Sequence, residues 1–396
     1  MRMIGMISGT SYDAIEAVAV DLELDGTTLQ CDLRGHVSHP YPDGLRAEIG
    51  AVLPPATTTV EQVCRLDTAI GQTFAEVADD LARTCFDGAA EAVCSHGQTV
   101  FHWVADGSAL GTLQLGEPAW IAERTGAAVV SDVRSRDLTV GGQGAPLASL
   151  LDVLLLGGPG SHTRAALNLG GIANITVVGP GTEPIAYDTG PANALLDAAV
   201  SHLSAGRHAY DEAGRRAAAG AVDRALLADL LDEPYYAAAP PKSTGKELFH
   251  LEYLLDRLAG RDVAPDDLLA TLVALTAETV AAELVRWQVC DVVASGGGTR
   301  NPTLMRELAA RLPGVTVRSI EDYGIPSAAK EALVFAVVGF LTLHNLPATV
   351  ASCTGASRSV VLGSVTPGRA PLALRVAEQA PSRAVIRTAL VEAVPT

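Results

Sequence analysis

The stretch GMISGTSYDAIEAVAVDL, residues 5–22, decides the fold. Two apolar segments with the composition of buried strands flank four small residues, Ser8 to Ser11, and Asp13 follows them. A turn of this kind leaves backbone N–H groups free, and such groups bind phosphate oxygens. The stretch therefore predicts a phosphate-binding turn, with Asp13 holding a water or Mg²⁺, or simply a tight hairpin with polar turn residues.

This pattern occurs twice in the chain. Residues 2–35 predict strand, turn, strand, turn, strand, and residues 165–190, AALNLGGIANITVVGPGTEPIAYDTG, repeat that order of elements. A repeat of this size predicts two α/β halves built on one plan, and the length of 396 residues suits two domains. Ligands of α/β proteins bind at interdomain clefts and at the carboxyl ends of strands, so a cleft between the halves is expected.

Other segments of the sequence predict individual helices and strands. Residues 61–85 predict a helix from their apolar spacing, and residues 92–100 predict a strand that runs into a polar turn. After residue 190 helical patterns dominate. The apolar run 333–343 is too short to span a bilayer and predicts a core helix. The segment after 367 has no predicted role.

Composition narrows the class of protein. Because 48% of the residues are hydrophobic and only 18% are charged, the chain is expected to be globular rather than disordered. The net charge of −17, with no basic stripe, argues against nucleic-acid binding. The six cysteines have neither C-x-x-C nor metal-ligand spacing, which is typical of reduced thiols in a cytosolic protein. The first residues form no signal-peptide core.

Two further glycine-rich turns follow strands. Asn168, Gly170 and Gly171 lie at the same step of the second half as Ser8 to Ser11 do in the first, as a clamp on a polyphosphate requires. A third turn follows a buried strand and precedes a helix, and its glycines would admit a nucleotide's base and ribose, or would form a flexible connection. Its glycines are Gly296, Gly297 and Gly298.

Two side chains are candidates for chemistry. Asp188 ends an apolar strand before a helix opened by Pro191, so it is expected to be catalytic, with a helix cap as the alternative. His96, in SHGQTVFH, is either a cleft residue or a structural histidine. The chain contains neither a P-loop motif nor a strand-linked G-x-G-x-x-G.

Stretches along nearly the whole chain, in order, resemble the anhydro-N-acetylmuramic acid kinase family of the sugar kinase, Hsp70 and actin superfamily. The stretches are MISGTSYD, SHGQTVFH, QLGEPAWIAERTG, VVSDVRSRDLTVGGQGAPL, LNLGGIANIT, YDTGPANALLD, PPKSTGKELF, SGGGTRNPTLM, KEAL with FA, and TGAS with VVLG. The resemblance implies a two-domain actin-like ATPase fold with duplicated ribonuclease H-like halves and an interdomain cleft. Residues 1–155 would form the first domain with part of the sugar site, residues 156–367 the second with the nucleotide site, and 368–396 a tail of unknown role.

The resemblance also implies an activity. The expected enzyme is a cytoplasmic homodimer of peptidoglycan recycling that uses ATP and Mg²⁺ and contacts neither nucleic acid nor membrane. It would convert 1,6-anhydro-N-acetylmuramic acid, ATP and water into N-acetylmuramic acid 6-phosphate and ADP.

Site residues follow by matching the motifs. Asp188 matches the catalytic base, and Arg134 is expected to meet the lactyl carboxylate of the sugar. The expected sugar-side residues are His96, Gln98, Thr99, Arg134 and Glu331. The expected nucleotide contacts are the glycine turns of the second half with Gly9, Thr10, Ser11, Tyr12, Asp13, Ala14, Ile15 and Glu16.

The chain departs from the family pattern at several positions, and at two of them Ala14 replaces a glycine and Glu16 an aspartate. These changes are expected to weaken activity without abolishing it. The alternatives are a related kinase acting on an ordinary sugar hydroxyl, a nucleotide-binding switch, and a degenerate member that binds sugar and nucleotide without transferring phosphate. The complete YDTGP and KEAL motifs favour the kinase over the switch.

Overall fold

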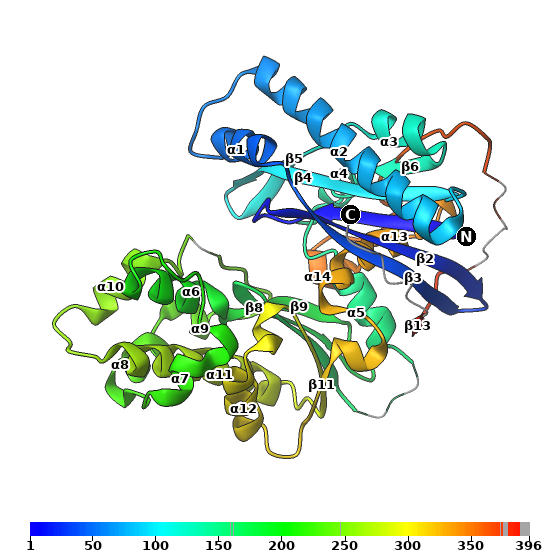
Figure 1. Ribbon diagram of the computed structural model, residues 1–396. Coiled ribbons are helices and arrows are strands. Elements are labelled where there is room, and N and C mark those ends of the chain that lie inside the picture. Colours follow the sequence, from blue (N-terminus) through cyan, green and yellow to red (C-terminus); the bar gives the residue numbers. More distant parts are fainter. Residues whose placement is uncertain (159, 161, 246, 373, 375–378, 389–396) are drawn as a thin grey trace. The chain divides into compact units, whose positions relative to one another are not determined.

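The chain forms two compact units. The computed structural model describes residues 1–158, 160, 162–245, 247–372, 374 and 379–388 (Figure 1). Unit 1 comprises Met1–Gly158 and Tyr323–Thr396, and unit 2 comprises Pro159–Asp322.

Unit 1 is built on an eight-stranded sheet in the order β12-β6-β4-β1-β2-β3-β13, with β5 paired to β4. The antiparallel meander β1-β2-β3 forms one half of it, and β4 and β6 run parallel to β1. The strands are β1 (Arg2–Ser8), β2 (Ala14–Asp25), β3 (Thr28–Pro40), β4 (Ala92–Ala105), β5 (Ser108–Leu115), β6 (Ala128–Ser131), β12 (Ser364–Thr366) and β13 (Arg383–Thr388).

Helices cover this sheet. The helices of unit 1 are α1 (Asp43–Val52), α2 (Val60–Phe86), α3 (Pro118–Thr125), α4 (Ser135–Leu138), α5 (Ser149–Leu156), α13 (Lys330–Leu343) and α14 (Ala351–Thr354). The prediction of a helix over 61–85 is confirmed by α2. It begins at a capping box in which the Thr59 hydroxyl accepts from the Gln62 amide, and it ends at Asp87 in the left-handed conformation.

The predicted core helix is α13, and it explains why the C-terminal part of the chain belongs to unit 1. A side chain on Gly5 of β1 would come within 2.1 Å of the Ala332 carbonyl oxygen. A side chain on Gly339 would likewise meet Met3 at 2.5 Å. The two glycines therefore let α13 lie directly on β1, and its side chains from Ala332 to Thr342 are buried.

Unit 2 has a five-stranded sheet in the order β11-β10-β7-β8-β9. Its strands are β7 (Arg164–Leu169), β8 (Ile172–Val178), β9 (Ile185–Pro191), β10 (Asp291–Ser295) and β11 (Thr316–Ser319). Its helices are α6 (Asn193–Leu203), α7 (Arg215–Ala219), α8 (Arg224–Leu231), α9 (Pro234–Ala237), α10 (Leu251–Leu258), α11 (Pro265–Arg286) and α12 (Pro302–Arg311). Short 3₁₀ helices of the chain are η1 (Glu212–Gly214), η2 (Gly297–Arg300), η3 (Ile320–Tyr323) and η4 (Ser327–Ala329).

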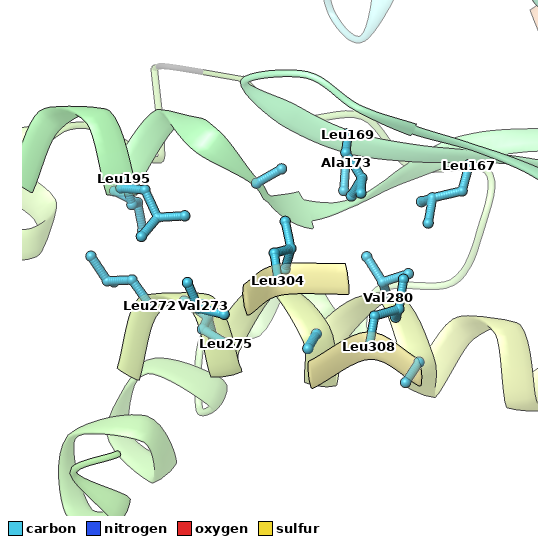
Figure 2. Close-up of a cluster of buried hydrophobic side chains, with 14 of the residues drawn as sticks. Leu167, Leu169, Ala173, Leu195, Leu272, Val273, Leu275, Val280, Leu304 and Leu308 are labelled. Atoms are coloured by element: carbon cyan, nitrogen blue, oxygen red, sulfur yellow. The ribbon is translucent and has the colours of Figure 1, made fainter. Parts of the chain in front are cut away.

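The core of unit 2 lies between its sheet and the helices α11 and α12. Figure 2 shows Leu167 and Leu169 of β7 over Val280 of α11 and over Leu304 and Leu308 of α12. Among the described helices α11 alone has the length and hydrophobicity of a membrane span, but 83% of its most apolar window is buried, as in a core helix.

The two sheets share one topology. Each sheet contains an antiparallel three-strand meander, and two further strands extend the sheet in parallel from the first strand of that meander. These further strands are β4 and β6 in unit 1 and β10 and β11 in unit 2. The prediction of two α/β halves built on one plan is therefore confirmed. The predicted cleft involves both units at once and stays a prediction.

Three features differ from the sequence-based expectations. The second unit ends at Asp322 rather than at 367, because α13 packs on β1. β4 continues past the expected turn to Ala105, because it pairs with β5 through two register shifts. The tail contributes β13, which runs parallel to β3 at the sheet edge.

Candidate functional site

The first predicted phosphate turn joins β1 to β2, and a buried glutamine holds it. Gln98 of β4 is fully buried, and its Oε1 accepts a hydrogen bond from the Ser8 hydroxyl at 2.5 Å. Its Nε2 donates to the carbonyl oxygens of Gly9 at 3.2 Å and Thr99 at 3.1 Å. The structure thus places Gln98 as a brace for the turn, whereas the motif match predicts a sugar contact.

The turn itself exposes its small residues. Thr10, Ser11 and Asp13 are exposed, and Asp13 Oδ1 accepts from the Ser11 hydroxyl at 2.7 Å and from the Ala14 amide at 3.0 Å. The Tyr12 ring packs beside Gly50 instead of facing solvent fully, and Ile15 is buried in the core. Of the predicted nucleotide stretch, Ile15 is therefore a core residue, and the exposed part ends at Asp13.

Glu16 is fixed on the face of the sheet. Its Oε1 accepts from the Ser38 hydroxyl at 2.6 Å, and its Oε2 lies 2.8 Å from His36 Nε2. Both partners are on β3. Ser38 is paired with Glu16 in the register, and His36 lies two residues from Ser38 on the same strand. The weakened activity expected from Glu16 stays a prediction.

On the predicted sugar side, the buried His96 pairs with the partly buried Arg134. Arg134 Nε donates to His96 Nε2 at 2.7 Å, and His96 Nδ1 lies 3.0 Å from the Gly97 carbonyl oxygen. Burial and the arginine charge lower the pKa of His96 to about 3. The ring is therefore neutral near pH 7, with its proton on Nδ1, and accepts from the guanidinium.

Arg134 has one further partner and a nearby opposite charge. Its Nη1 donates to the Gly144 carbonyl oxygen at 2.7 Å, which fixes the plane of the guanidinium. Burial lowers the pKa of Arg134 to about 10, while the Glu331 charge acts in the opposite direction. For Glu331, at the start of α13, desolvation raises the carboxyl pKa, and the charges of Lys330 and Arg134 lower it. Glu331 is reached by solvent nonetheless, so a ligand can contact it.

A cavity of about 510 Å³ adjoins His96 in unit 1. Ser95, Gln114, Glu117 and Asp132 also line it. The buried Ser95 hydroxyl has no hydrogen-bond partner in the part of the chain that the structure describes, and Gln114 Nε2 donates to the Thr99 hydroxyl at 3.1 Å. A polar cavity of this size suits a small molecule. A larger one, about 840 Å³, lies beside β2 and β3, and none of the predicted site residues lines it.

In unit 2 the second and third glycine turns lie against each other. An added side chain on Gly296 would meet Asn168 Oδ1 at 2.6 Å, and one on Gly298 would meet the Leu169 Cβ at 2.7 Å. Asn193, at the start of α6, closes the arrangement by donating its Nδ2 to the carbonyl oxygens of Leu169 at 3.2 Å and Gly170 at 2.8 Å. Sequence reasoning missed Asn193, although it lies in the quoted YDTGPANALLD motif.

The five glycines of these turns have different roles. Gly296 and Gly298 are needed for the packing just described. Gly171 and Gly297 are exposed, a side chain on Gly171 would touch only the Ala194 Cβ at 3.8 Å, and one on Gly297 would touch nothing within 4 Å. Gly170 is intermediate in exposure. The open backbone of Gly171 and Gly297 is therefore where a phosphate or ribose has room to approach.

Asp188 lies on β9, opposite Asn174 of β8, and its carboxylate is oriented by a distant loop that contains Ser243 and Thr244. Oδ2 accepts from the Ser243 hydroxyl and from the Thr244 amide, each at 3.0 Å. Partial burial raises the pKa of the carboxyl, the two hydrogen bonds lower it, and the nearby Glu247 raises it. Both hydrogen bonds use Oδ2, so within the described chain Oδ1 is left to accept a proton.

The loop that holds Asp188 was not predicted as part of the site. In the sequence, the run Lys242-Ser243-Thr244-Gly245-Lys246 has the wrong order of residues for a P-loop. Lys242 forms a buried ion pair with Glu283 of α11 at 3.1 Å. A sequence signal for this loop exists, because PPKSTGKELF is one of the stretches that resemble the family. The residues around it, however, do not indicate which strand the loop packs against.

Few side chains near the phosphate turns could hold a magnesium ion. Within the described residues no three His, Cys, Asp or Glu side chains cluster as metal ligands. Mg²⁺ with a nucleotide is commonly held by one or two carboxylates together with phosphate oxygens and waters. Asp13 fits such a role, because it is exposed at the phosphate turn and only its Oδ1 is engaged.

Comparison with known proteins gives a consistent result over most of the chain. Residues 1–368 match the family described as anhydro-N-acetylmuramic acid kinase. The anhydro-N-acetylmuramic acid kinase of Streptomyces coelicolor is 60% identical over 376 residues, which cover 94% of this chain and 96% of the relative. That of Rhodococcus erythropolis is 55% identical over 376 residues, 93% of this chain and 94% of the relative.

Solved structures resemble the chain more remotely. A ROK family glucokinase from Streptomyces griseus in complex with glucose and AMPPNP has a TM-score of 0.37 and 12% identity, covering 85% of this chain and 98% of that one. The ROK hexokinase from Thermus thermophilus has a TM-score of 0.34 and 17% identity, with 87% and 100% covered.

Proposed function

The chain belongs to the anhydro-N-acetylmuramic acid kinase family, and we propose that it opens 1,6-anhydro-N-acetylmuramic acid with water while phosphorylating O6 from ATP. The products are N-acetylmuramic acid 6-phosphate and ADP, as peptidoglycan recycling in the cytoplasm requires. The observation that carries the proposal is the Asp188 carboxylate, oriented through Oδ2 and with Oδ1 available.

The reaction needs a base and a leaving group. Water attacks C1 of the sugar, the C1–O6 bond breaks, and O6 takes the γ-phosphoryl group as ADP leaves. Neutral water is a poor nucleophile, so a carboxylate must accept its proton, and Asp188 is the proposed base. Burial raises the pKa of this carboxyl above its usual value, although two hydrogen bonds lower it, so Asp188 is a stronger base than a solvated aspartate.

The nucleotide is proposed to bind through backbone groups. Phosphoryl transfer depends on positioning and charge neutralisation more than on covalent help. Gly171 and the Thr10 to Asp13 turn offer exposed backbone for phosphate oxygens, and Gly297 offers room for the ribose. Mg²⁺, when bound with ATP, would neutralise phosphate charge, and Asp13 is the side chain proposed to hold it.

The sugar is proposed to bind on the unit 1 side chains. Arg134 offers a guanidinium fixed by His96 and Gly144, which suits the planar lactyl carboxylate. Glu331 is proposed to accept from a sugar hydroxyl. Thr99, whose hydroxyl accepts from Gln114 Nε2, keeps its predicted role as a proposal, whereas the amide of Gln98 is already engaged by the turn. A homodimer is proposed from the family alone.

The test is sugar-dependent ADP release by the purified protein. ATP consumption is expected with the anhydro sugar and not with N-acetylmuramic acid, which lacks the bridge between C1 and O6. ADP release with glucose or with N-acetylmuramic acid, and none with the anhydro sugar, would favour a kinase acting on an ordinary hydroxyl. Binding of both ligands without ADP release would favour a degenerate member.

A further inference from the structure

Unit 2 contains a buried ion pair that the proposed chemistry does not use. Lys242 Nζ lies 3.1 Å from Glu283 Oε1, and the two side chains are only 5% and 9% exposed. The ammonium also donates to the Tyr236 carbonyl oxygen at 2.9 Å and lies 5.0 Å from the centre of the Tyr235 ring. Burying two charges is costly unless their geometry and additional hydrogen bonds compensate, so such a pair needs a reason.

Glu283 is held rigidly on the helix side. Its Oε2 accepts from the Tyr187 hydroxyl at 2.8 Å, and that hydroxyl accepts from Trp287 Nε1 at 2.8 Å. Arg286 lies 3.5 Å from the same Oε2. The carboxylate is therefore a fixed point on α11, tied to β9 through the residue directly before Asp188.

Lys242 connects this fixed point to the proposed base. The Asp188 amide donates to the Lys242 carbonyl oxygen at 3.0 Å, which joins the loop to β9. The next two residues, Ser243 and Thr244, donate to Asp188 Oδ2. The Tyr235 hydroxyl donates to the Asp188 carbonyl oxygen at 2.8 Å. The lysine side chain thus anchors the loop, and the two residues that come directly after the lysine hold the Asp188 carboxylate.

A glycine allows the other end of this loop to approach β9. Gly190 has φ +149°, and a side chain there would meet the Tyr236 ring at 2.8 Å. Tyr236 therefore packs directly on the strand two residues after Asp188. With Lys242 bonded to the Tyr236 carbonyl oxygen, both ends of the segment 236–242 are fixed over β9.

We propose that Lys242, through its ion pair with Glu283, is a positioning residue for Asp188, because it holds in place the loop that orients the carboxylate. This inference rests on the proposed function of Asp188 as the base. A merely structural ion pair would stabilise unit 2 without a separate effect on the chemical step.

The variant Lys242→Met tests this, because it removes the ammonium while keeping a long side chain. Small misplacement of a catalytic group costs up to about 100-fold in rate. We therefore expect kcat to fall at least about tenfold, with KM for ATP and for the anhydro sugar almost unchanged. Amide hydrogen exchange is expected to become faster at Thr244 and Asp188, because the amide of each donates a hydrogen bond between the loop and the strand.

The double variant Lys242→Met with Glu283→Gln separates positioning from stability. The second substitution neutralises the buried carboxylate, which the first deprives of its closest positive charge and leaves with the half-exposed Arg286. The new amide oxygen can still accept from the Tyr187 hydroxyl. The melting temperature is therefore expected to recover relative to Lys242→Met, while kcat stays low. Recovery of kcat together with the melting temperature would overturn the proposal, as would unchanged kcat and unchanged exchange in Lys242→Met.

Arg164→Met is the matched control, because Arg164 pairs with Asp291 in the same unit at 3.3 Å and is not in the Asp188 loop. It is expected to lower the melting temperature and to leave kcat near that of the unmodified protein. Failure of the proposed function would be seen separately, because the unmodified protein would then release no ADP with the sugar. The exchange measurement would still decide whether Lys242 holds the loop.

Discussion

The Ser243 hydroxyl lies 3.0 Å from Oδ2 of Asp188, the same oxygen that accepts from the Thr244 amide. Both bonds favour the ionised carboxylate and lower its pKa, whereas burial and the Glu247 charge raise it. The loop therefore sets both the direction in which the carboxylate points and the pH at which it can act as a base.

The variant Ser243→Ala should move the acid limb of the kcat profile to higher pH. A base must be ionised to act, so activity falls as the pH drops through the pKa of Asp188. Removing the Ser243 bond removes one influence that lowers this pKa, and the pKa rises. Ser243→Thr keeps a hydroxyl and serves as the control. An acid limb that stays in place, or moves to lower pH, would contradict the proposed base.

The variant Gly171→Val should block nucleotide binding while leaving the fold intact. The added side chain has only the Ala194 Cβ near it, so it enters the open space proposed for phosphate. The ATP dissociation constant measured by calorimetry is expected to rise more than about tenfold, or about 1.4 kcal/mol. Unchanged affinity would remove the turn from the nucleotide site.

Gly298→Val makes the matched comparison. Its Cβ would come within 2.7 Å of the Leu169 Cβ and 3.0 Å of the Leu169 carbonyl oxygen, so the variant should destabilise the protein instead. Overpacking of this kind costs about 1–3 kcal/mol. A lower melting temperature for Gly298→Val, but not for Gly171→Val, is the expected pattern.

Much of this arrangement is local, and local patterns predicted it. The three-strand meanders, the helix over 61–85 and the glycine turns follow from residue spacing and turn chemistry, and the capping box at Thr59 fixes one helix start. The repeat of the meander also predicted the shared sheet topology. The chain is therefore most predictable where neighbours in sequence are neighbours in space.

The remaining features depend on contacts between distant segments. The parallel pairing of β13 with β3 joins residues more than 350 positions apart, and no local signal specifies it. Gln98 is polar and lies in a motif, yet the pairing of β4 with β1 buries it against Ser8. The Lys242 and Glu283 charges are each ordinary in sequence, and only the fold brings them together.

The variant Arg134→Lys should weaken recognition of the lactyl group. Lysine keeps a positive charge but not the planar fork that His96 and Gly144 orient. KM for the anhydromuramic sugar is expected to rise several-fold. The same anhydro sugar without its lactyl ether should react equally well with variant and unmodified protein. An equal loss for both sugars would mean that Arg134 does not contact the carboxylate.

The central claim is that Asp188 directs water to C1 while O6 takes the phosphoryl group. Asp188→Asn keeps the size and hydrogen-bonding capacity of the side chain but cannot accept the proton. It should bind ATP and sugar with near-native affinity and turn over at least about 100-fold more slowly. Near-normal turnover would contradict the assignment of Asp188.

The most direct measurement is turnover in ¹⁸O-labelled water, followed by mass spectrometry of the products. The account predicts one heavy oxygen at C1 of the N-acetylmuramic acid 6-phosphate formed by the unmodified protein, and none newly in its phosphate. Asp188→Asn should form the same labelled product, only more slowly. Heavy oxygen in phosphate and none at C1 would mean that water attacks ATP, and the coupled ring opening would be wrong.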